Sequence, residues 1–304
     1  MRKIASIAVF GVLLVSISAC STPGMNSASC DVKGNADLVT AAGEFGGDPE
    51  ATFPTPLIAS TTGVTESITG DGDPVPAGGV VAGTVSIYSG ETGEPVVSGG
   101  PLVSVPILFT TNDFILPFTS SLQCGSNGSR VISTGSAGDL LGEKASVEQF
   151  QIDPETAVVV VADIASSYIG RANGADQLAQ GGMPAIVLAP NGQPGFTFPD
   201  SAPPTELEVD LLKKGAGAVT KADDIVIVQF SAINWAGEEL LQSTWVNNNG
   251  SPIAVPLGAA EDNGVMTAEV KKSLVGQTVG SQLLIAVPGD QTVVYVIDVL
   301  GIAE

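Results

Sequence analysis

Short apolar runs rich in β-branched residues alternate with glycine, proline and aspartate along most of the chain. Runs of this kind, bounded by turn-forming residues, are typical of β-strands. In the second half the pattern predicts strands over Ile225–Phe230, Gln282–Val287 and Thr292–Leu300. The chain is therefore expected to be mostly strand.

One short helix is predicted in each half. In the second half, Thr267 is placed to cap a helix over Ala268–Val275, and Val270 and Leu274 then share one face at i and i+4. In the first half the equivalent stretch is Pro117–Leu122, whose proline stands where the first turn of a helix tolerates it. Many strands with one short helix per half indicate an α+β fold.

The two halves of the chain repeat each other. Four segments of the first half match four segments of the second half in the same order. The matched pairs are Gly47–Pro54 with Gly192–Pro199, Val85–Gly90 with Ile227–Ala232, Ser121–Val131 with Ser273–Leu283, and Val158–Asp163 with Val293–Asp298. This shared order predicts a tandem duplication in which Tyr88 corresponds to Phe230.

The boundaries of the two copies follow from composition. Residues 165–190 include Gly181-Gly182 and lead into a proline-containing stretch, so they are interpreted as a linker. We therefore expect one domain at 46–164, a second at 191–304, and a leading segment at 20–45 that tethers the first domain.

The N-terminus carries an export signal. Arg2-Lys3 supplies positive charge, and the apolar run Ile4–Ile17 is shorter than the roughly 20 residues that a membrane-spanning helix needs. Ile17-Ser18-Ala19-Cys20 then fits the bacterial lipobox, which predicts a signal peptide at 1–19 and lipidation of Cys20. The alternative is an ordinary signal peptide followed by a chance cysteine. Lipidation would hold the protein at the extracytoplasmic face of the cell membrane.

Two further cysteines are then left in an exported protein. Disulfides persist in compartments outside the cytoplasm, so Cys30 and Cys124 are expected to form a bridge. Such a bridge would have a structural role, because it closes a long loop of the unfolded chain.

Composition excludes several classes of function. The 304 residues include no histidine, which removes histidine-based catalytic triads and histidine-ligated zinc. Eleven basic residues against 32 acidic ones give a net charge of −21, so nucleic acid is not expected as a partner. The acidic stretch Gly70–Pro74 is interpreted as a turn rather than a calcium site. Neither a metal nor a cofactor is expected.

The segment Ile225–Gly301 resembles an FKBP-type peptidyl-prolyl isomerase domain of the exported bacterial kind. The residues that carry this resemblance are Val226–Ser231, Trp235–Gly237, Gln242–Trp245, Pro256–Gly258, Leu274–Ser281 and Val294–Gly301. The first half, roughly Phe53–Ile164, resembles a more diverged copy. The resemblance implies two FKBP-like domains, each a twisted antiparallel sheet wrapped over one short α-helix.

The resemblance also indicates which residues would line a proline-binding pocket. In the second half these positions hold Phe230, Leu241, Gln242, Ile253, Met266, Val270 and Tyr295. The Phe-Asp pair of the family falls on Leu241-Gln242, and its floor tryptophan falls on Val270. The flap before the last strand is reduced to Pro288–Gln291.

The first half departs from the family in a different way. It has Tyr88 at the first-strand aromatic position, Phe118 at the floor and Val97 where the family has the phenylalanine of its Phe-Asp pair. It also retains a longer flap over Gly135–Glu155. The carboxylate of the family is absent from both halves.

Two functions are consistent with these residues. The resemblance implies a membrane-anchored peptidyl-prolyl isomerase that assists the folding of exported proteins, with weak activity because the pocket positions are degenerate. The alternative is a non-catalytic binding or chaperone module that keeps the fold. In both cases the expected partners are proline-containing exported or unfolded polypeptides, together with the membrane through the anchor.

Overall fold

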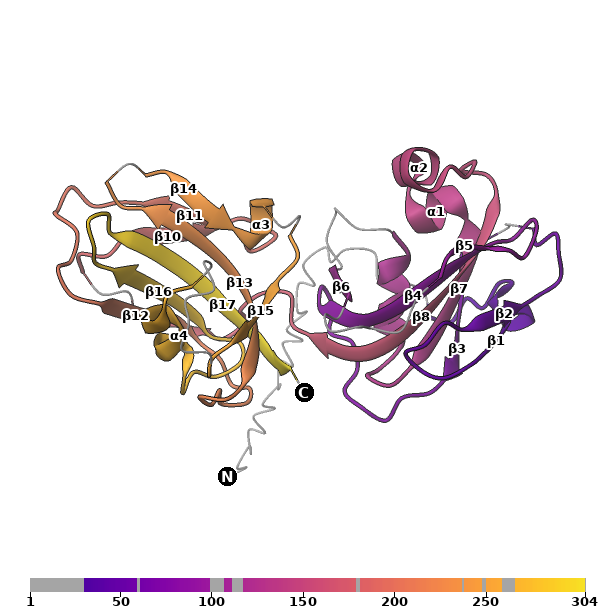
Figure 1. The fold of residues 1–304 in the computed structure, drawn as a ribbon, viewed down its shortest axis with the longest axis horizontal. Coiled ribbons are helices and arrows are strands. Elements are labelled where there is room, and N and C mark those ends of the chain that lie inside the picture. Colours follow the sequence, from indigo (N-terminus) through magenta and orange to yellow (C-terminus); the bar gives the residue numbers. More distant parts are fainter. Residues whose placement is uncertain are drawn as a thin grey trace, which may run out of the picture.

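The computed structural model describes residues 30–58, 61–98, 107–110, 117–178, 181–236, 238–247, 250–258 and 266–303. The predicted signal peptide and Cys20 lie outside these residues. The described chain is mostly β-sheet with few and short helices, an α+β fold, and its two halves lie side by side (Figure 1). None of the helices within the described ranges is long and apolar enough to cross a membrane.

The first half is built on an antiparallel sheet with the strand order β3-β7-β8-β4-β5, in which β6 also pairs with β4. These strands are β3 (Gly63–Ile68), β4 (Val80–Ser89), β5 (Pro95–Val97), β6 (Ile107–Thr110), β7 (Arg130–Ser136) and β8 (Ala157–Tyr168). The longest strands, β4 and β8, are Val- and Ile-rich and lie at the centre, where both of their faces are covered.

The second half repeats this path with the order β9-β12-β16-β17-β13-β14, in which β15 also pairs with β13. These strands are β9 (Ala175–Asp176), β12 (Glu208–Lys214), β13 (Ile225–Asn234), β14 (Leu240–Ser243), β15 (Ile253–Pro256), β16 (Gln282–Val287) and β17 (Val293–Ala303). The three strands predicted in this half are confirmed as β13, β16 and β17.

Three β-bulges in each sheet fix the equivalence of the two sheets residue by residue. They interrupt β3/β7, β4/β8 and β4/β5 in the first half and β12/β16, β13/β17 and β13/β14 in the second half. The bulged steps are Glu66/Ile68 with Leu211/Lys213, Ala82/Gly83 with Ile227/Val228, and Ile87/Tyr88 with Ala232/Ile233. The sheets are therefore two copies of one unit, but Tyr88 is equivalent to Ile233, and the expected pairing of Tyr88 with Phe230 is wrong.

Each copy also carries a small two-stranded sheet outside its main sheet. In the first copy it is β1 (Thr40–Ala42) with β2 (Glu50–Thr52), and in the second it is β10 (Ala185–Leu188) with β11 (Pro194–Thr197). The repeated segments that start at Gly47 and Gly192 form the second strand of each pair.

The predicted linker at 165–190 is wrong. Strand β8 continues to Tyr168, β9 pairs with the end of β12, and β10 pairs with β11. These residues contain turn-forming glycines and prolines, but their backbone groups are used in sheets. Likewise, the predicted tether at 20–45 is incorporated into the first domain from Cys30 onward, because this part contains a disulfide, the 3₁₀ turn η1 (Ala36–Leu38) and β1.

The helix predicted in the second half is confirmed as α4 (Ala268–Leu274). The Thr267 hydroxyl accepts a hydrogen bond from the backbone N–H of Val270 at 3.5 Å, and Val270 and Leu274 are fully buried. Its counterpart in the first half is a 3₁₀ helix, η2 (Pro117–Cys124), which buries Phe118 and Leu122. The remaining short helices are α1 (Ala137–Leu141), α2 (Glu143–Ala145), the π-helical turn η3 (Ser146–Phe150) and α3 (Thr244–Asn247).

The halves meet through a small apolar cluster. Tyr168 and Ala82 of the first half pack with Ile227 and Leu300 of the second. Gly301 lies directly against the Tyr168 ring, and a Cβ at this position would overlap that ring. Ala82 and Ile227 are equivalent positions of the two copies, so both units use the same end of the same strand at the junction.

Candidate functional site

In the second half, four of the predicted pocket residues share one face of the sheet. Phe230 on β13 and Tyr295 on β17 point toward α4, where they join Met266 and Val270 in a single buried cluster. The alternation of side chains along β13 explains this placement, since every second residue from Val226 to Ala232 belongs to the same cluster.

Two more of these positions are fixed by strand pairing. Gln242 pairs with Ala232, which in turn pairs with Tyr295, so the Gln242 side chain lies on the same face as the cluster. Ile253 pairs with Val228 and packs against the edge of the cluster. Leu241 stands at the bulge between β13 and β14, and 47% of its surface is exposed.

The second half therefore brings six of its seven predicted positions together, all except Leu241, but it does so as a packed surface. Phe230 is 1% exposed, Val270 0% and Tyr295 7%, so the aromatic rings lie within the core with little free edge. The turn between β16 and β17, where the family has its flap, contains only Pro288–Thr292. Chemically, the arrangement offers an apolar face bordered by an amide at Gln242 and no charged side chain from the predicted set.

The first half fills the corresponding space with its own flap. Phe118 is 1% exposed and packs in one cluster with Leu140 and Leu141 of α1 and with Val160 of β8. Helix α1 begins at a serine cap, where the Ser136 hydroxyl accepts a hydrogen bond from the backbone N–H of Asp139 at 3.0 Å. The retained flap is therefore a helical cap that seals this side of the sheet.

Tyr88 does not belong to this site. It lies on the opposite face of the first sheet, in a cluster with Leu57, Ile132 and Val159, and its hydroxyl donates to the backbone carbonyl of Pro49. Burial, together with the nearby Asp48 carboxylate, raises the pKa of Tyr88. The prediction that Tyr88 and Phe118 line one pocket is wrong. Successive side chains of a strand point to opposite faces of the sheet, and Tyr88 points to the face opposite the cluster of Phe118.

Val97 lies on the expected face of the first sheet, but it does not correspond to the residue of the second half that the sequence predicted. It pairs with Ile87 and packs against the cluster that contains Phe118. Because the β4/β5 and β13/β14 bulges match, Val97 is the equivalent of Gln242 rather than of Leu241.

A buried ion pair on the other face of the first sheet was not anticipated from the sequence. Arg130 on β7 donates from Nε and Nη2 to the two carboxylate oxygens of Asp163 on β8, at 2.6 and 2.8 Å. The remaining guanidinium hydrogens reach the carbonyls of Ala41, Gly43 and Glu44 at 3.4, 3.2 and 2.9 Å. The hydrogen bonds with Asp163 raise the pKa of Arg130.

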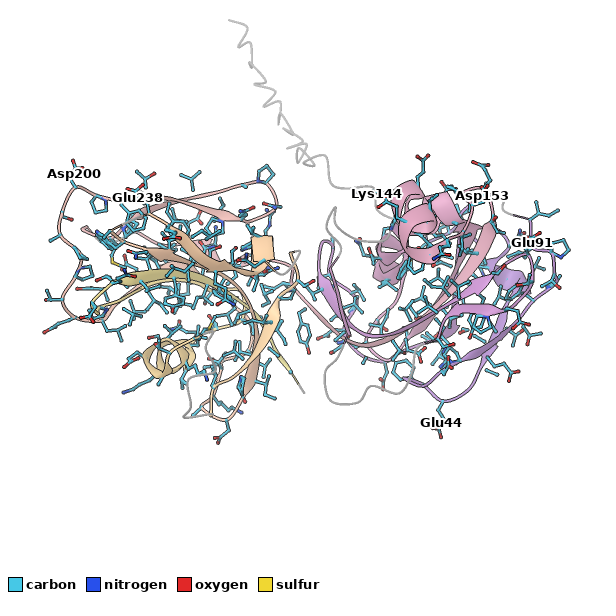
Figure 2. The ribbon with its side chains drawn as sticks, turned by 45° about the horizontal axis from the view of Figure 1, so that its top comes forward. Glu44, Glu91, Lys144, Asp153, Asp200 and Glu238 are labelled. Carbon is cyan, nitrogen blue, oxygen red and sulfur yellow. A yellow bond between two sulfur atoms is a disulfide. The ribbon has the colours of Figure 1, made fainter. Side chains whose placement is uncertain are left out.

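This ion pair holds the leading segment onto the sheet. In Figure 2 Glu44 lies on one side of the first domain, while Lys144 and Asp153 mark the helical cap on the other side. A signal for the pair was present in the repeat, because Arg130 follows Gly128-Ser129 and Asp163 ends a valine run, and the second half repeats both contexts at Gln282 and Asp298.

Cys30 and Cys124 are joined in a disulfide, with their Cα atoms 5.5 Å apart. The bond also borders a hollow of about 290 Å³ that is lined by Lys33, Val64, Glu66 and Val131. None of the predicted pocket residues lines this hollow. Within the described ranges, no three acidic or cysteine side chains gather in a way that could hold a metal ion.

No protein-family model matches the chain, and no curated protein matches it. Solved structures that match include the three FKBP domains of wheat FKBP73, at 12% identity over 79% of this chain and 94% of that chain, with a TM-score of 0.33. A peptidyl-prolyl isomerase from Pseudomonas syringae pv. tomato matches at 21% identity over 35% of this chain and 74% of that chain, with a TM-score of 0.29. FkpA from Escherichia coli matches at 14% identity over 41% and 53%, with a TM-score of 0.27. TM-scores of this size do not establish a shared fold.

Proposed function

We propose that this chain is a lipid-anchored FKBP-type peptidyl-prolyl isomerase that acts weakly, through its second domain, on proline-containing exported polypeptides. The observation that carries the proposal is the convergence of Phe230, Met266, Val270 and Tyr295 on one face of the second sheet, bordered by Gln242 and Ile253. The anchor at Cys20 and the extracytoplasmic location follow from the lipobox and are part of the proposal.

The reaction needs no acid or base from the protein. Rotation about a prolyl peptide bond is opposed by amide resonance, with a barrier of about 18–20 kcal/mol in water. An apolar surface that removes the bond from water disfavours the planar, charge-separated form and so favours the twisted state. Ile253, which is half-buried, and the exposed edge of Tyr295 can supply this environment, supported by Phe230 in the same cluster. The absence of histidine is no obstacle.

Weak activity follows from three replacements relative to the family. Gln242 stands in place of a carboxylate, Val270 gives a smaller floor than tryptophan, and the short β16–β17 turn leaves the substrate uncovered. Each replacement lowers the interaction with the twisted bond more than it lowers the interaction with the planar bond.

The proposal predicts that the chain from Ser21 onward accelerates the cis-to-trans isomerisation of a proline tetrapeptide. Phe230→Leu is expected to lower kcat/KM about tenfold, which corresponds to about 1.4 kcal/mol of transition-state stabilisation. Phe118→Leu is the matched control, because both phenylalanines are 1% exposed and lie on the helix side of their sheets. It is expected to leave the rate unchanged.

Thermal unfolding of both variants separates lost activity from lost folding. A single change of this size in the core costs about 1 kcal/mol in each case, so equal stability losses with unequal rates support the second domain as the active one. Acceleration that Phe118→Leu abolishes and Phe230→Leu preserves would assign the activity to the first domain instead.

A second prediction concerns Gln242, which is half-buried at the border of the cluster. Gln242→Asp is expected to raise kcat/KM by roughly tenfold, because a carboxylate stabilises the electropositive carbonyl carbon of the twisted bond. Gln242→Asn is the control for side-chain length and is expected to leave the rate unchanged. Equal rates for the two variants would contradict the proposed position of Gln242 beside the reacting bond.

The alternative is a non-catalytic binding module, and one observation favours it. The floor residue of each half is inaccessible to a substrate. Phe118 is covered by Leu140 and Leu141 of α1, and Val270 is completely buried. If the chain captures an unfolded, proline-containing polypeptide but does not accelerate isomerisation at micromolar concentration, the binding module replaces the enzyme as the function.

A further inference from the structure

A row of polar residues crosses the second sheet at the position of the first sheet's ion pair. In the first half Asp163 pairs with Arg130 on the neighbouring strand. In the second half the equivalent residues are Asp298 on β17 and Gln282 on β16, and the next residue in the row is Lys213 on β12. In the first half the cationic residue, Arg130, is on the strand next to the aspartate, whereas in the second half the cationic residue, Lys213, is two strands away from Asp298.

The Asp298 carboxylate is deeply buried with neutral partners. It is 4% exposed, and its hydrogen bonds come from Gln282 Nε2 at 2.7 Å and from the backbone N–H of Ala172 at 2.9 Å. Ala172 lies in the connector, residues 169–174, which joins β8 of the first domain to β9 of the second. Asp298 thus ties the connector to the centre of the second sheet.

The surrounding charges do not replace the missing arginine. Lys213 is engaged by Asp176 at 2.5 Å near the sheet edge, and Arg171 in the connector donates to the carbonyl of Pro190 at 2.6 Å. The neighbours that pair with Asp298 across the sheet are Gln229 on β13 and Gln282 on β16, and both are neutral. The buried Asp210 on β12 lies on the same face, where it pairs with Leu284, two positions along β16 from Gln282. Burial raises the pKa of Asp298 to about 6, although hydrogen bonds from Ala172 and Gln282 and the charges of Lys213 and Arg171 oppose this shift.

We propose that Asp298 is a pH-sensitive switch of the second domain, in which protonation stabilises the domain by removing a buried charge whose hydrogen-bond partners are neutral. On protonation the Gln282 amide rotates, so that its oxygen accepts from the carboxyl O–H. The other Asp298 oxygen continues to accept from Ala172. Both oxygens of the Asp298 carboxyl then remain hydrogen-bonded and the carboxyl no longer carries a buried charge.

The direction of the pH effect follows from the two pKa values. The ordinary pKa of this carboxyl is 3.8, so in the unfolded chain it is already ionised at pH 5, whereas in the folded chain it takes up a proton below about 6. Between these values the folded state binds more protons than the unfolded state, so stability decreases as the pH rises. From about pH 5 to about pH 7 the unfolding equilibrium constant of the second domain is expected to increase roughly tenfold.

Tryptophan fluorescence of the full chain isolates the second domain, because both tryptophans of the chain, Trp235 and Trp245, belong to it. Chemical unfolding followed by this signal at pH 5 and pH 7 is compared for the natural chain and for Asp298→Asn. The asparagine keeps the acceptor for Ala172 and donates to Gln282 without a charge. We expect Asp298→Asn to abolish the roughly tenfold pH effect and to stabilise the second domain at pH 7.

The matched control is Asp163→Asn, the same change at the equivalent position of the first domain, followed by circular dichroism. It removes the partner of Arg130 and is expected to destabilise, opposite in sign to Asp298→Asn. Gln282→Arg, which restores the ion pair, is a second route to a pH-independent second domain. An unchanged pH response in both Asp298→Asn and Gln282→Arg would overturn the proposal, as would equal destabilisation by Asp298→Asn and Asp163→Asn at pH 7.

Discussion

Replacing Arg130 with glutamine is expected to lower the free energy of unfolding of the first domain by about 3–5 kcal/mol. The substitution leaves the Asp163 carboxylate, 2% exposed, without its cation and removes the donors to the carbonyls of Gly43 and Glu44. A buried charge that loses its partner costs more than the net contribution of the pair, so the loss is expected to be large even if the pair itself contributes little. Glutamine is chosen because the second domain has it at this position.

Urea unfolding followed by circular dichroism and by tryptophan fluorescence measures this effect in the full chain. We expect the circular dichroism transition of Arg130→Gln to move to lower urea, while the tryptophan transition of the second domain stays in place. Lys144→Gln is the control, because its ion pair with Glu148 is fully at the surface of the same domain and is worth at most about 1 kcal/mol. Equal effects of the two variants would contradict a dominant role for burial.

A double variant separates the pair from the isolated charge. Arg130→Gln with Asp163→Asn removes both charges, so it is expected to be more stable than Arg130→Gln alone. If the double variant is less stable by the sum of the two single losses, the two side chains do not interact and the interpretation fails.

The elements of the fold were predictable because they depend on local patterns. The run Gln282–Val287 became β16 with the same bounds, and the Thr267 cap and the Val270–Leu274 face were read correctly for α4. Both signals are contained within a few consecutive residues, so no knowledge of the rest of the chain was needed.

The site was less predictable because it depends on which face each residue occupies. Sequence similarity matched Tyr88 with Phe230, but the strand registers make Tyr88 equivalent to Ile233. A shift by an odd number of residues moves a side chain to the other face of the sheet. The bulges that fix the register are invisible in the sequence, and so the predicted pocket of the first half was divided between two faces.

The failure to predict the ion pair and the wrong prediction of a linker have a related cause. Arg130 and Asp163 are separated by 33 positions, and they meet only because β7 and β8 pair in one register. Residues 175–176 become strand β9 only because the end of β12 is there to pair with them. Contacts of this kind depend on strand partners that are distant in sequence, and local composition does not indicate which strands pair.

Removing the disulfide is expected to cost about 4–5 kcal/mol of stability in the first domain. In the chain-entropy model, a bridge between residues separated by 94 positions, Cys30 and Cys124, restricts the unfolded chain by about this amount. The bridge fastens Cys30 of the leading segment to Cys124 at the end of η2. The adjacent backbone is paired as well, since the N–H of Val64 donates to the carbonyl of Val32 at 2.8 Å. The double variant Cys30→Ser with Cys124→Ser is therefore expected to unfold at lower urea when followed by circular dichroism.

Reductant supplies the internal control for this prediction. It is expected to lower the stability of the natural chain to that of the double serine variant and to leave the variant unchanged, because Cys20 is the same in both. The tryptophan transition is expected to stay in place, since both cysteines of the bridge belong to the first domain. A double variant as stable as the natural chain would show that the native pairing around Val32 and Val64 already orders the leading segment, so that the bridge adds nothing to it.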